Sequence, residues 1–484
     1  MTRATAVLIG VCLLAAALVA GAIWGARRTH NASDYLGASR RLGVWLTALS
    51  HTANATPAWL LFSLVGAAFV WGLSAIWMAL ALLCGSLLNW FYVAPRLRRL
   101  AVGRGSVSVV QVVGAEAGER LQALLIRSSA LILGVGLILL IAAQLHVLAE
   151  VAARDLGVSA TATIILCAAA YSLFVAVGGY WAASLADAIA LLALLAVASL
   201  LLIPAVFAAG GMEQLQLGFA SLGPSATDLL GARSGVVAVA FVVGTLGLGL
   251  ALPGQPQGLS RFIATRDEAT LRSARWWALS FSAVLFAVLL ACGWVAQVLY
   301  AGIANPDLAL FALATRILPP GTGALLALLL LATVLVSIGG QLLVLAGLVA
   351  VDLRRTNASV SQPAAHVTTV AVAILAACVA LYSPAPLLEQ SMFAFTLLGA
   401  AFGPLVLVRV AGKRIRRTAA LGAMWAGAIL VSLFHLLPDS PGDFLERVLP
   451  FVAALGIALT GGERRSNPDR ADRAQETVHD RVPI

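Results

Sequence analysis

Two short stretches place polar side chains, glycine and proline inside long apolar runs. The first is Ser50-His51-Thr52-Ala53-Asn54-Ala55-Thr56-Pro57, and the second is Pro253-Gly254-Gln255-Pro256, preceded by Gly244, Gly247 and Gly249. Proline removes a helical hydrogen bond and glycine weakens the remainder, so each stretch is expected to break a helix. Freed backbone groups beside hydroxyl groups can bind a hard cation or a polar solute. The alternative is that both prolines are ordinary kinks in packed helices.

Covalent chemistry has no comparable signal in the sequence. There is no cluster of His, Cys and acidic residues with ligand spacing, no nucleophile elbow, and no glycine-rich phosphate loop outside an apolar run. The five cysteines each lie alone in an apolar run and predict neither a disulfide framework nor a zinc site. We therefore expect a binding protein without an organic cofactor, not an enzyme.

The composition identifies the solvent around these stretches. Of 484 residues, 61% are hydrophobic and 11% are charged, with a mean hydropathy of +0.97. Soluble proteins are about 45–50% apolar and about 25% charged. One soluble core could not hide so much apolar surface, so the chain is predicted to be an all-α polytopic membrane protein.

Thirteen runs are long enough to be membrane-spanning helices, which need about 20 apolar residues. They lie near residues 5–25, 43–70, 73–94, 126–148, 161–178, 186–208, 234–256, 276–300, 322–350, 367–383, 390–411, 418–437 and 445–461. A cleaved signal peptide has a shorter apolar core than the first run, so this run is expected to remain as a span.

The positive charges predict the orientation of these spans. Nearly all of the 31 Lys and Arg residues fall in segments that alternate spans would place on one side. The opposite side holds only Arg3, Arg154, Arg233, Arg316 and Arg447. Because Lys and Arg stay in the cytoplasm, the N-terminus is predicted to be periplasmic and the C-terminus cytoplasmic. Short clusters at span ends, without interleaved aromatics, do not suit nucleic-acid binding.

The order of the spans predicts an internal repeat. Spans two to six (43–208) and seven to eleven (234–411) each contain five helices, and each set opens with a broken helix. Because five is odd, the second set enters the membrane from the opposite face, which gives a 5+5 inverted repeat. Residues 1–42 would form a peripheral span and a cytoplasmic loop, and residues 412–461 two further peripheral spans. The polar tail, 462–484, is expected to be disordered.

Several short motifs, in order, resemble the solute:sodium symporter family, and in particular its sodium/proline symporter branch. They are Ser33-Asp34-Tyr35-Leu36-Gly37, Trp59-Leu60-Leu61, Leu88-Asn89-Trp90, Gly178-Gly179-Tyr180 leading to Asp187, Gly254-Gln255-Pro256 with Arg261-Phe262, and Gln341-Leu342-Leu343 leading to Asp352-Leu353. The resemblance covers about residues 1–460. It implies the bacterial leucine transporter-like fold, alternating access and sodium-driven uptake of an organic solute.

The resemblance also implies positions for the coupling ion. Sodium would bind backbone oxygens of Ala53 and Thr56 at the first break, with the Thr333 carbonyl and the Ser337 hydroxyl on a facing helix. One family ligand and a nearby carboxylate are missing, because Val336 replaces a hydroxyl residue and Ala55 replaces an aspartate. Hard cations want several oxygen ligands, so these losses should weaken the site.

The expected solute site lies at the same breaks. Its candidate residues are Thr52, Asn54, Gln144, Leu248, Leu252, Gln255 and Pro256. Leu140, Leu248 and Leu252 stand where proline symporters carry aromatic side chains, so the resemblance does not assign proline as the solute. The solute is expected to be an amino acid, a carboxylate or a similar small molecule. Interhelical hydrogen bonding is the alternative role for Asn54, Thr56 and Ser337.

Two ionisable residues are candidates for coupling or gating. Asp187 is a carboxylate at a family position, and buried carboxylates in membranes are expensive and usually functional. The alternative is a hydrated carboxylate at the cytoplasmic end of its span. His51 lies within the predicted break, where it could carry a proton. Alternatively, it is a neutral imidazole bonded to backbone groups freed there.

These observations predict a sodium-coupled symporter in a bacterial inner membrane. A proton-coupled transporter is one alternative. Another is a sensor that keeps the fold without transporting, because similar domains in relatives are fused to histidine kinases. The sequence defines neither the solute nor the oligomeric state.

Overall fold

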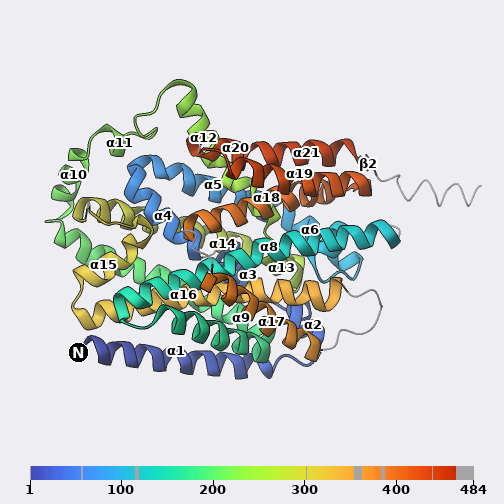
Figure 1. Cartoon of the computed structure of the whole chain (residues 1–484), viewed down its shortest axis with the longest axis horizontal. Coiled ribbons are helices and arrows are strands. Elements are labelled where there is room, and N and C mark those ends of the chain that lie inside the picture. Colours follow the sequence, from blue (N-terminus) through green and yellow to red (C-terminus); the bar gives the residue numbers. More distant parts are fainter. Residues whose placement is uncertain are drawn as a thin grey trace, which may run out of the picture.

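The computed structural model describes residues 2–55, 58–114, 119–300, 302–353, 362–382, 387–438 and 440–464. Most of its long helices run roughly along one axis of the molecule (Figure 1). The prediction of an all-α membrane protein is confirmed. Three predictions lie outside the described residues: the helix break at Thr56-Pro57, the role of Thr56, and the disorder of 465–484, which is most of the tail.

The first half of the chain contains the polar stretch of α3 and a long bent helix. Its elements are α1 (Arg3–Ala26), α2 (Ala32–Gly37), η1 (Ala38–Arg40), α3 (Val44–Ala55), α4 (Ala58–Trp71), η2 (Gly72–Ala75), α5 (Ile76–Leu87), η3 (Leu88–Val93), α6 (Ala94–Gly103), α7 (Val109–Gly114), α8 (Glu119–Val151), η4 (Ala152–Leu156) and α9 (Ala160–Ala208).

The second half contains the second interruption and the C-terminal helices. Its elements are α10 (Met212–Ser221), α11 (Pro224–Thr227), α12 (Gly235–Leu250), η5 (Leu252–Gly254), α13 (Pro256–Ala264), α14 (Glu268–Leu299), η6 (Pro306–Leu308), α15 (Ala309–Ile317), α16 (Pro320–Gly347), η7 (Leu348–Asp352), α17 (Gln362–Tyr382), α18 (Leu387–Val410), β1 (Lys413–Ile415), α19 (Arg417–His435), η8 (Pro441–Asp443), α20 (Phe444–Arg447), α21 (Leu449–Thr460) and β2 (Gly462–Arg464). Strands β1 and β2 form one short antiparallel pair.

The predicted count of thirteen spans is not confirmed. Ten helices of the described residues are long and apolar enough to cross a membrane. The difference arises at three places. Residues 62–103 follow one another without a loop, although Gly72, with φ +58°, separates α4 from α5. Helix α9 joins two predicted spans, and α21 has only 12 residues.

Helix α9 folds back on itself at Gly179. A straight helix of its 49 residues would be about 70 Å long, more than twice the hydrocarbon thickness. Gly179 has φ +59° and ψ −152°, a conformation that side-chain-bearing residues rarely adopt. Along α1, Gly21 faces Phe174 and Gly25 faces Gly178, whereas Ala193 lines the same cavity as Gly10 near the opposite end of α1. The two halves of α9 therefore run in opposite directions.

The core of the bundle is formed by α16 and α18. The most apolar windows of these helices are 89% and 83% buried within the protein, against 17% for α1 and 33% for α19. Figure 1 shows α1 at one edge of the bundle and α19 with α21 at the opposite edge. It also shows α10, α11 and α15 gathered at one end, with α2, α6 and β2 at the other. The segments α2, α6 and β2, all predicted to be cytoplasmic, therefore share one end.

The second interruption lies between two helices, α12 and α13. The sequence predicts a span that ends at residue 256, followed by a loop. Instead, the chain continues as α13, in which every residue but Ser260 is buried. Gln255 is extended, with φ −89° and ψ +100°, and Pro256 begins the new helix at the position where a missing N–H costs nothing. The predicted cytoplasmic Arg261 is consequently brought into the protein interior.

Candidate functional site

The polar stretch of α3 lies against the second interruption. The structure describes α3 as far as Ala55 and α4 from Ala58, while η5 and the extended Gln255 separate α12 from α13. A Cβ atom added to Gly258, in the first turn of α13, would lie 3.5 Å from the Ala55 Cα atom. Residues 50–55 are helical, so this part of the polar stretch is not unwound. The predicted second interruption is present at Gln255, whereas the predicted first one falls on residues 56 and 57 and stays a prediction.

His51 joins the two helices near this meeting point. Its Nδ1 atom lies 3.0 Å from the Gly258 carbonyl oxygen, and since a carbonyl only accepts, Nδ1 carries the proton. The imidazole stacks on Phe262 at 4.2 Å between ring centroids and meets Trp90 edge-on at 4.9 Å. The Nε2 atom has no hydrogen-bond partner within the described part of the chain. His51 therefore occupies intact helix α3, not the break in which the sequence placed it.

A fully buried ion pair connects α9 with α13. Arg261 Nη2 donates to Asp187 Oδ2 at 2.8 Å, and both side chains are 0% exposed. Asn54 Nδ2 donates to the same carboxylate oxygen at 2.7 Å and to the Ser50 carbonyl at 2.8 Å. Asp187 Oδ1 has no partner among the described residues. Burial excludes the hydrated, membrane-edge position for Asp187 that the sequence left open.

The arginine is held by neutral groups as well as by the carboxylate. Arg261 Nη1 donates to Ser184 Oγ at 2.9 Å, and its guanidinium lies 4.2 Å from the centroid of the Tyr180 ring. The Tyr180 hydroxyl lies 3.1 Å from Ser260 Oγ, one residue before the arginine. A buried charge is tolerated only when it is paired and hydrogen-bonded, and Arg261 satisfies both conditions.

A second polar cluster links α8 to α16. Gln144 Nε2 donates to Gln341 Oε1 at 3.0 Å and to the Leu140 carbonyl at 2.8 Å. The Ser337 hydroxyl contacts Gln144 Oε1 and also donates to the Val334 carbonyl at 2.8 Å. Two proposed site residues, Gln144 and Ser337, are therefore direct neighbours. In this structure their polar groups serve interhelical bonding, the alternative that the sequence left open for Ser337.

The candidate sodium ligands come from helices that touch. Ala53 lies on α3, and Thr333 and Ser337 are buried on α16. On the same helix, Gly340 packs so closely against the Asn54 amide oxygen that a Cβ atom there would overlap it. The Thr333 hydroxyl donates its proton to the Leu330 carbonyl at 2.7 Å. The hydroxyl oxygen and the carbonyl oxygen of Thr333 are both candidate ligands.

Tyr171 is a neighbour of the candidate ion site that the sequence analysis did not identify. Its hydroxyl donates to the Val336 carbonyl at 2.8 Å, at the position where the family hydroxyl is missing. Tyr171 is buried on α9 beside Gly339. A tyrosine in an apolar run gives no sequence signal for such a role. Arg261 did give one, because it belongs to a family motif, but its assignment to a loop concealed the pairing with Asp187.

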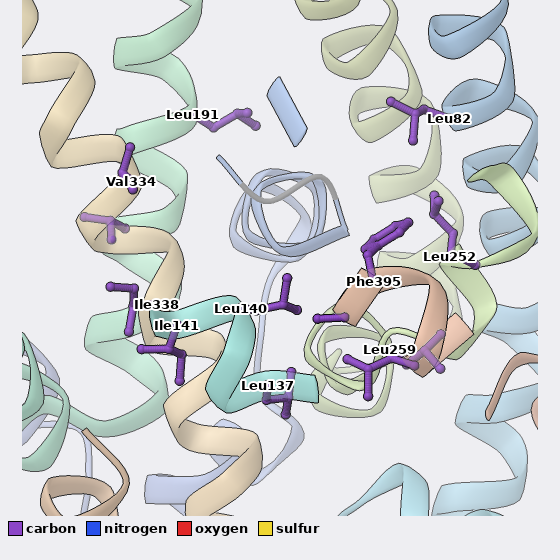
Figure 2. Packing of buried hydrophobic residues seen from close by; sticks show 14 of the residues in the cluster. Leu82, Leu137, Leu140, Ile141, Leu191, Leu252, Leu259, Val334, Ile338 and Phe395 are labelled. Atoms are coloured by element: carbon purple, nitrogen blue, oxygen red, sulfur yellow. The ribbon is translucent and has the colours of Figure 1, made fainter. Parts of the chain in front are cut away.

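The remaining solute-site candidates include three buried leucines and one amide. Leu140, Leu248 and Leu252 are each at most 1% exposed. Figure 2 shows Leu252 beside the ring of Phe395, with Leu140 of α8 pointing toward the same region. Gln255 Nε2 donates to the Phe395 carbonyl at 3.0 Å, and Gln257 donates to Gln255 Oε1 at 3.1 Å. Thr52 is buried on α3, and Pro256 opens α13.

A small cavity extends from this region toward the end of the molecule that holds α2 and α6. It has a volume of about 40 Å³, and Tyr180, Pro256 and Ser260 line it at one side. Ser108 and Asp352, whose side chains are hydrogen-bonded at 3.0 Å, line it too. A neighbouring cavity of about 100 Å³ is lined by residues of α2 and by Arg40. The second interruption therefore borders space at the predicted cytoplasmic end.

The sequence profile of the sodium:solute symporter family matches residues 35–427. The chain belongs to this family. As a member, it is a multi-pass membrane protein and a sodium-coupled symporter of a small solute, and the resemblance noted from its motifs is confirmed. The family and its curated relatives are transporters, not enzymes.

Relatives of this symporter match along most of its length. The osmoregulated proline transporter OpuE of Bacillus subtilis is 29% identical over 420 residues, which cover 84% of each chain. The high-affinity proline transporter PutP of the same organism is 28% identical, with 93% of this chain and 98% of PutP covered. The sodium/proline symporter of Escherichia coli is 28% identical, covering 89% of this chain and 88% of its own.

One solved structure shows the same fold. It is the substrate-bound outward-open state of a Na⁺-coupled sialic acid symporter. It superposes with a TM-score of 0.78 and 17% sequence identity, over 96% of this chain and 100% of that one. The predicted transporter fold class is thereby confirmed, although at this identity the comparison concerns the fold alone.

Proposed function

We propose that this symporter binds its solute where α3, α4, η5 and α13 meet, and that sodium binds beside it between α3 and α16. The observation that carries the proposal is the contact of the second interruption with the polar stretch of α3, with Gly258 of α13 against Ala55. A helix end leaves backbone groups unpaired, negative at its C-terminus and positive at its N-terminus. Opposed helix ends therefore offer carbonyls to a cation and N–H groups to an anion.

The proposed solute is an amino acid or a similar small carboxylate with an apolar part. Backbone N–H groups in the first turn of α13 would receive the carboxylate. Leu140, Leu248 and Leu252 would contact the apolar part, with Gln144 and Gln255 as polar neighbours. The relatives named above transport proline. We propose a different solute here, because leucine side chains offer no flat aromatic face to a pyrrolidine ring.

The proposed coupling ion is sodium, bound by the carbonyls of Ala53, Thr56 and Thr333 and by the Ser337 hydroxyl. His51 argues against proton coupling at the first interruption. Its Nδ1 proton is used on the Gly258 carbonyl, and Phe262 and Trp90 pack against its ring. A second proton would place an unpaired charge among apolar rings, which is costly inside a membrane protein.

Asp187 and Arg261 are proposed as the gating element. Their pair joins α9 of the first repeat to α13 of the second, and Asn54 ties it to α3. Movement of one repeat against the other must stretch or break a pair that spans them. The proposed orientation in a bacterial inner membrane has the N-terminus periplasmic and the C-terminus cytoplasmic.

Uptake into proteoliposomes tests the proposal. Labelled solute should accumulate when sodium is high outside, and accumulation should stop when a sodium ionophore removes the gradient. Uptake that follows a proton gradient alone would contradict sodium coupling. The solute itself can be found by thermal-shift screening of amino acids, carboxylates, sugars and osmolytes, with and without sodium, since a ligand of the folded state raises its stability. A solute that binds without flux would indicate a sensor instead.

A further inference from the structure

The start of α14 carries an exposed surface that the transport site does not use. It comprises Trp45 of α3, Phe91 of η3, and Arg272, Arg275, Trp276 and Trp277 of α14. We call these six residues the aromatic–arginine surface. Its four aromatic side chains are 41–64% exposed, which is unusual for rings of this size unless something apolar covers them.

The aromatic side chains of this surface contact one another in two pairs. Trp45 and Trp277 have ring centroids 4.6 Å apart, and Phe91 and Trp276 have centroids 5.7 Å apart with nearly perpendicular planes. Each pair joins α14 to a different element, α3 or η3. The rings are therefore held in fixed positions on the outside of the bundle by their partners.

The arginines bring positive charge to the same place. The Arg275 guanidinium lies 4.2 Å from the centroid of the Phe91 ring. Arg272, one turn earlier on the same face of α14, is exposed and has no acidic partner in the described parts of the chain. Nearby, Glu268 is already paired with Arg99 and Asp267 with Arg266. The nearby acidic side chains therefore already have ion-pair partners, and Arg272 and Arg275 remain without a counter-charge.

We infer that the aromatic–arginine surface binds the head group of an anionic phospholipid. The arginines lie just before the predicted membrane span and the tryptophans at its first residues, so charge and rings occupy the depths of the phosphate and of the head-group boundary. A phosphodiester would supply the missing negative charge, while the acyl chains would lie along the apolar surface of α14. Arginine, with its planar set of donors, suits phosphate oxygens well.

Brominated lipids can test this inference on the full chain. We would reconstitute the protein in phosphatidylcholine vesicles that contain ten mole per cent of either brominated phosphatidylglycerol or brominated phosphatidylcholine. The signal is quenching of tryptophan fluorescence. The quenching measured in a Trp276→Phe/Trp277→Phe variant, which keeps the other nine of the eleven tryptophans, is subtracted from that of the wild type. We expect stronger quenching by the glycerol lipid, with an affinity ratio of about fivefold per arginine.

Matched variants separate a specific site from general charge attraction. Arg272→Gln/Arg275→Gln should abolish the preference, and Arg272→Lys/Arg275→Lys should weaken it, because lysine keeps the charge but lacks the planar set of donors. Arg27→Gln/Arg127→Gln removes two exposed arginines elsewhere, one just after α1 and one in α8, and should leave the preference intact. Because Arg272 is exposed, Arg272→Gln alone supplies an answer if the double variant does not fold.

Three results would overturn the inference. They are equal quenching by the two lipids, a preference that survives Arg272→Gln/Arg275→Gln, and a preference that the Arg27→Gln/Arg127→Gln control loses equally. Millimolar inorganic phosphate should not compete, because the rings contribute only when an acyl chain places the head group against them. Competition by phosphate would also contradict a lipid site.

Discussion

Arg261 of α13 and Asp187 of α9 form an ion pair of 2.8 Å in which neither side chain has any exposed surface. Asn54 of α3 donates to the same carboxylate oxygen, so three helices share one charge centre. A buried pair need not stabilise a protein compared with apolar residues, but removing one partner leaves an uncompensated charge. Because of this asymmetry, single and double substitutions in the pair can test its roles in folding and in gating separately.

We expect Asp187→Asn to destabilise the symporter by about 3–5 kcal/mol, because Arg261 would keep its charge without a counter-ion. The double variant Asp187→Asn/Arg261→Gln should recover much of the thermal midpoint but not the sodium-driven uptake. Melting curves in detergent and uptake assays on the same preparations measure both effects. Full uptake by the double variant would show that the pair has no gating role.

Gly340→Ala should reduce uptake at least tenfold. The added Cβ atom would overlap the amide oxygen of Asn54 and push its side chain away from Asp187. Gly134→Ala on α8 is the control, because a Cβ atom added to Gly134 meets no atom within 4 Å. If both variants transport at the same rate, the position of Asn54 does not matter for transport.

Val336→Ser should lower the sodium concentration for half-maximal uptake by about fivefold to tenfold, roughly 1 kcal/mol of ion binding. The substitution restores a hydroxyl beside Ser337, and Ser337→Ala should have the opposite effect. The control is Val334→Ser, which introduces the same group on the opposite face of α16. Unchanged sodium dependence in Val336→Ser would place the ion elsewhere.

Asp307 should make stability depend on pH. Burial and, second, the nearby Glu150 carboxylate raise the pKa of Asp307 from 3.8 to about 6. The folded protein therefore holds this proton more tightly than the unfolded chain, and stability contributed by the protonated form is lost as the pH rises from about 4 to 6. Between pH 4.5 and 7, the thermal midpoint of wild type should fall relative to that of Asp307→Asn. Parallel midpoints across this range would contradict the raised pKa.

The apolar runs and the charges between them determined much of this protein by themselves. They require a helical membrane protein, because lipid leaves backbone groups no partner but the helix itself. The proline- and glycine-containing stretch around Pro253 likewise required an interrupted helix. Such properties depend on the local composition and on whether the solvent is water or lipid. Both can be read from the sequence.

Only the tertiary structure decided which groups meet. Pairing of Arg261 with Asp187 depends on α13 continuing inward after Gln255, and an amphipathic segment of nine residues reads equally well as a loop. The contact of Ala55 with Gly258, and that of Tyr171 with Val336, join residues more than 160 positions apart. Apolar periodicity fixes which residues are buried, but not which helix lies beside which, since that choice depends on packing between distant surfaces.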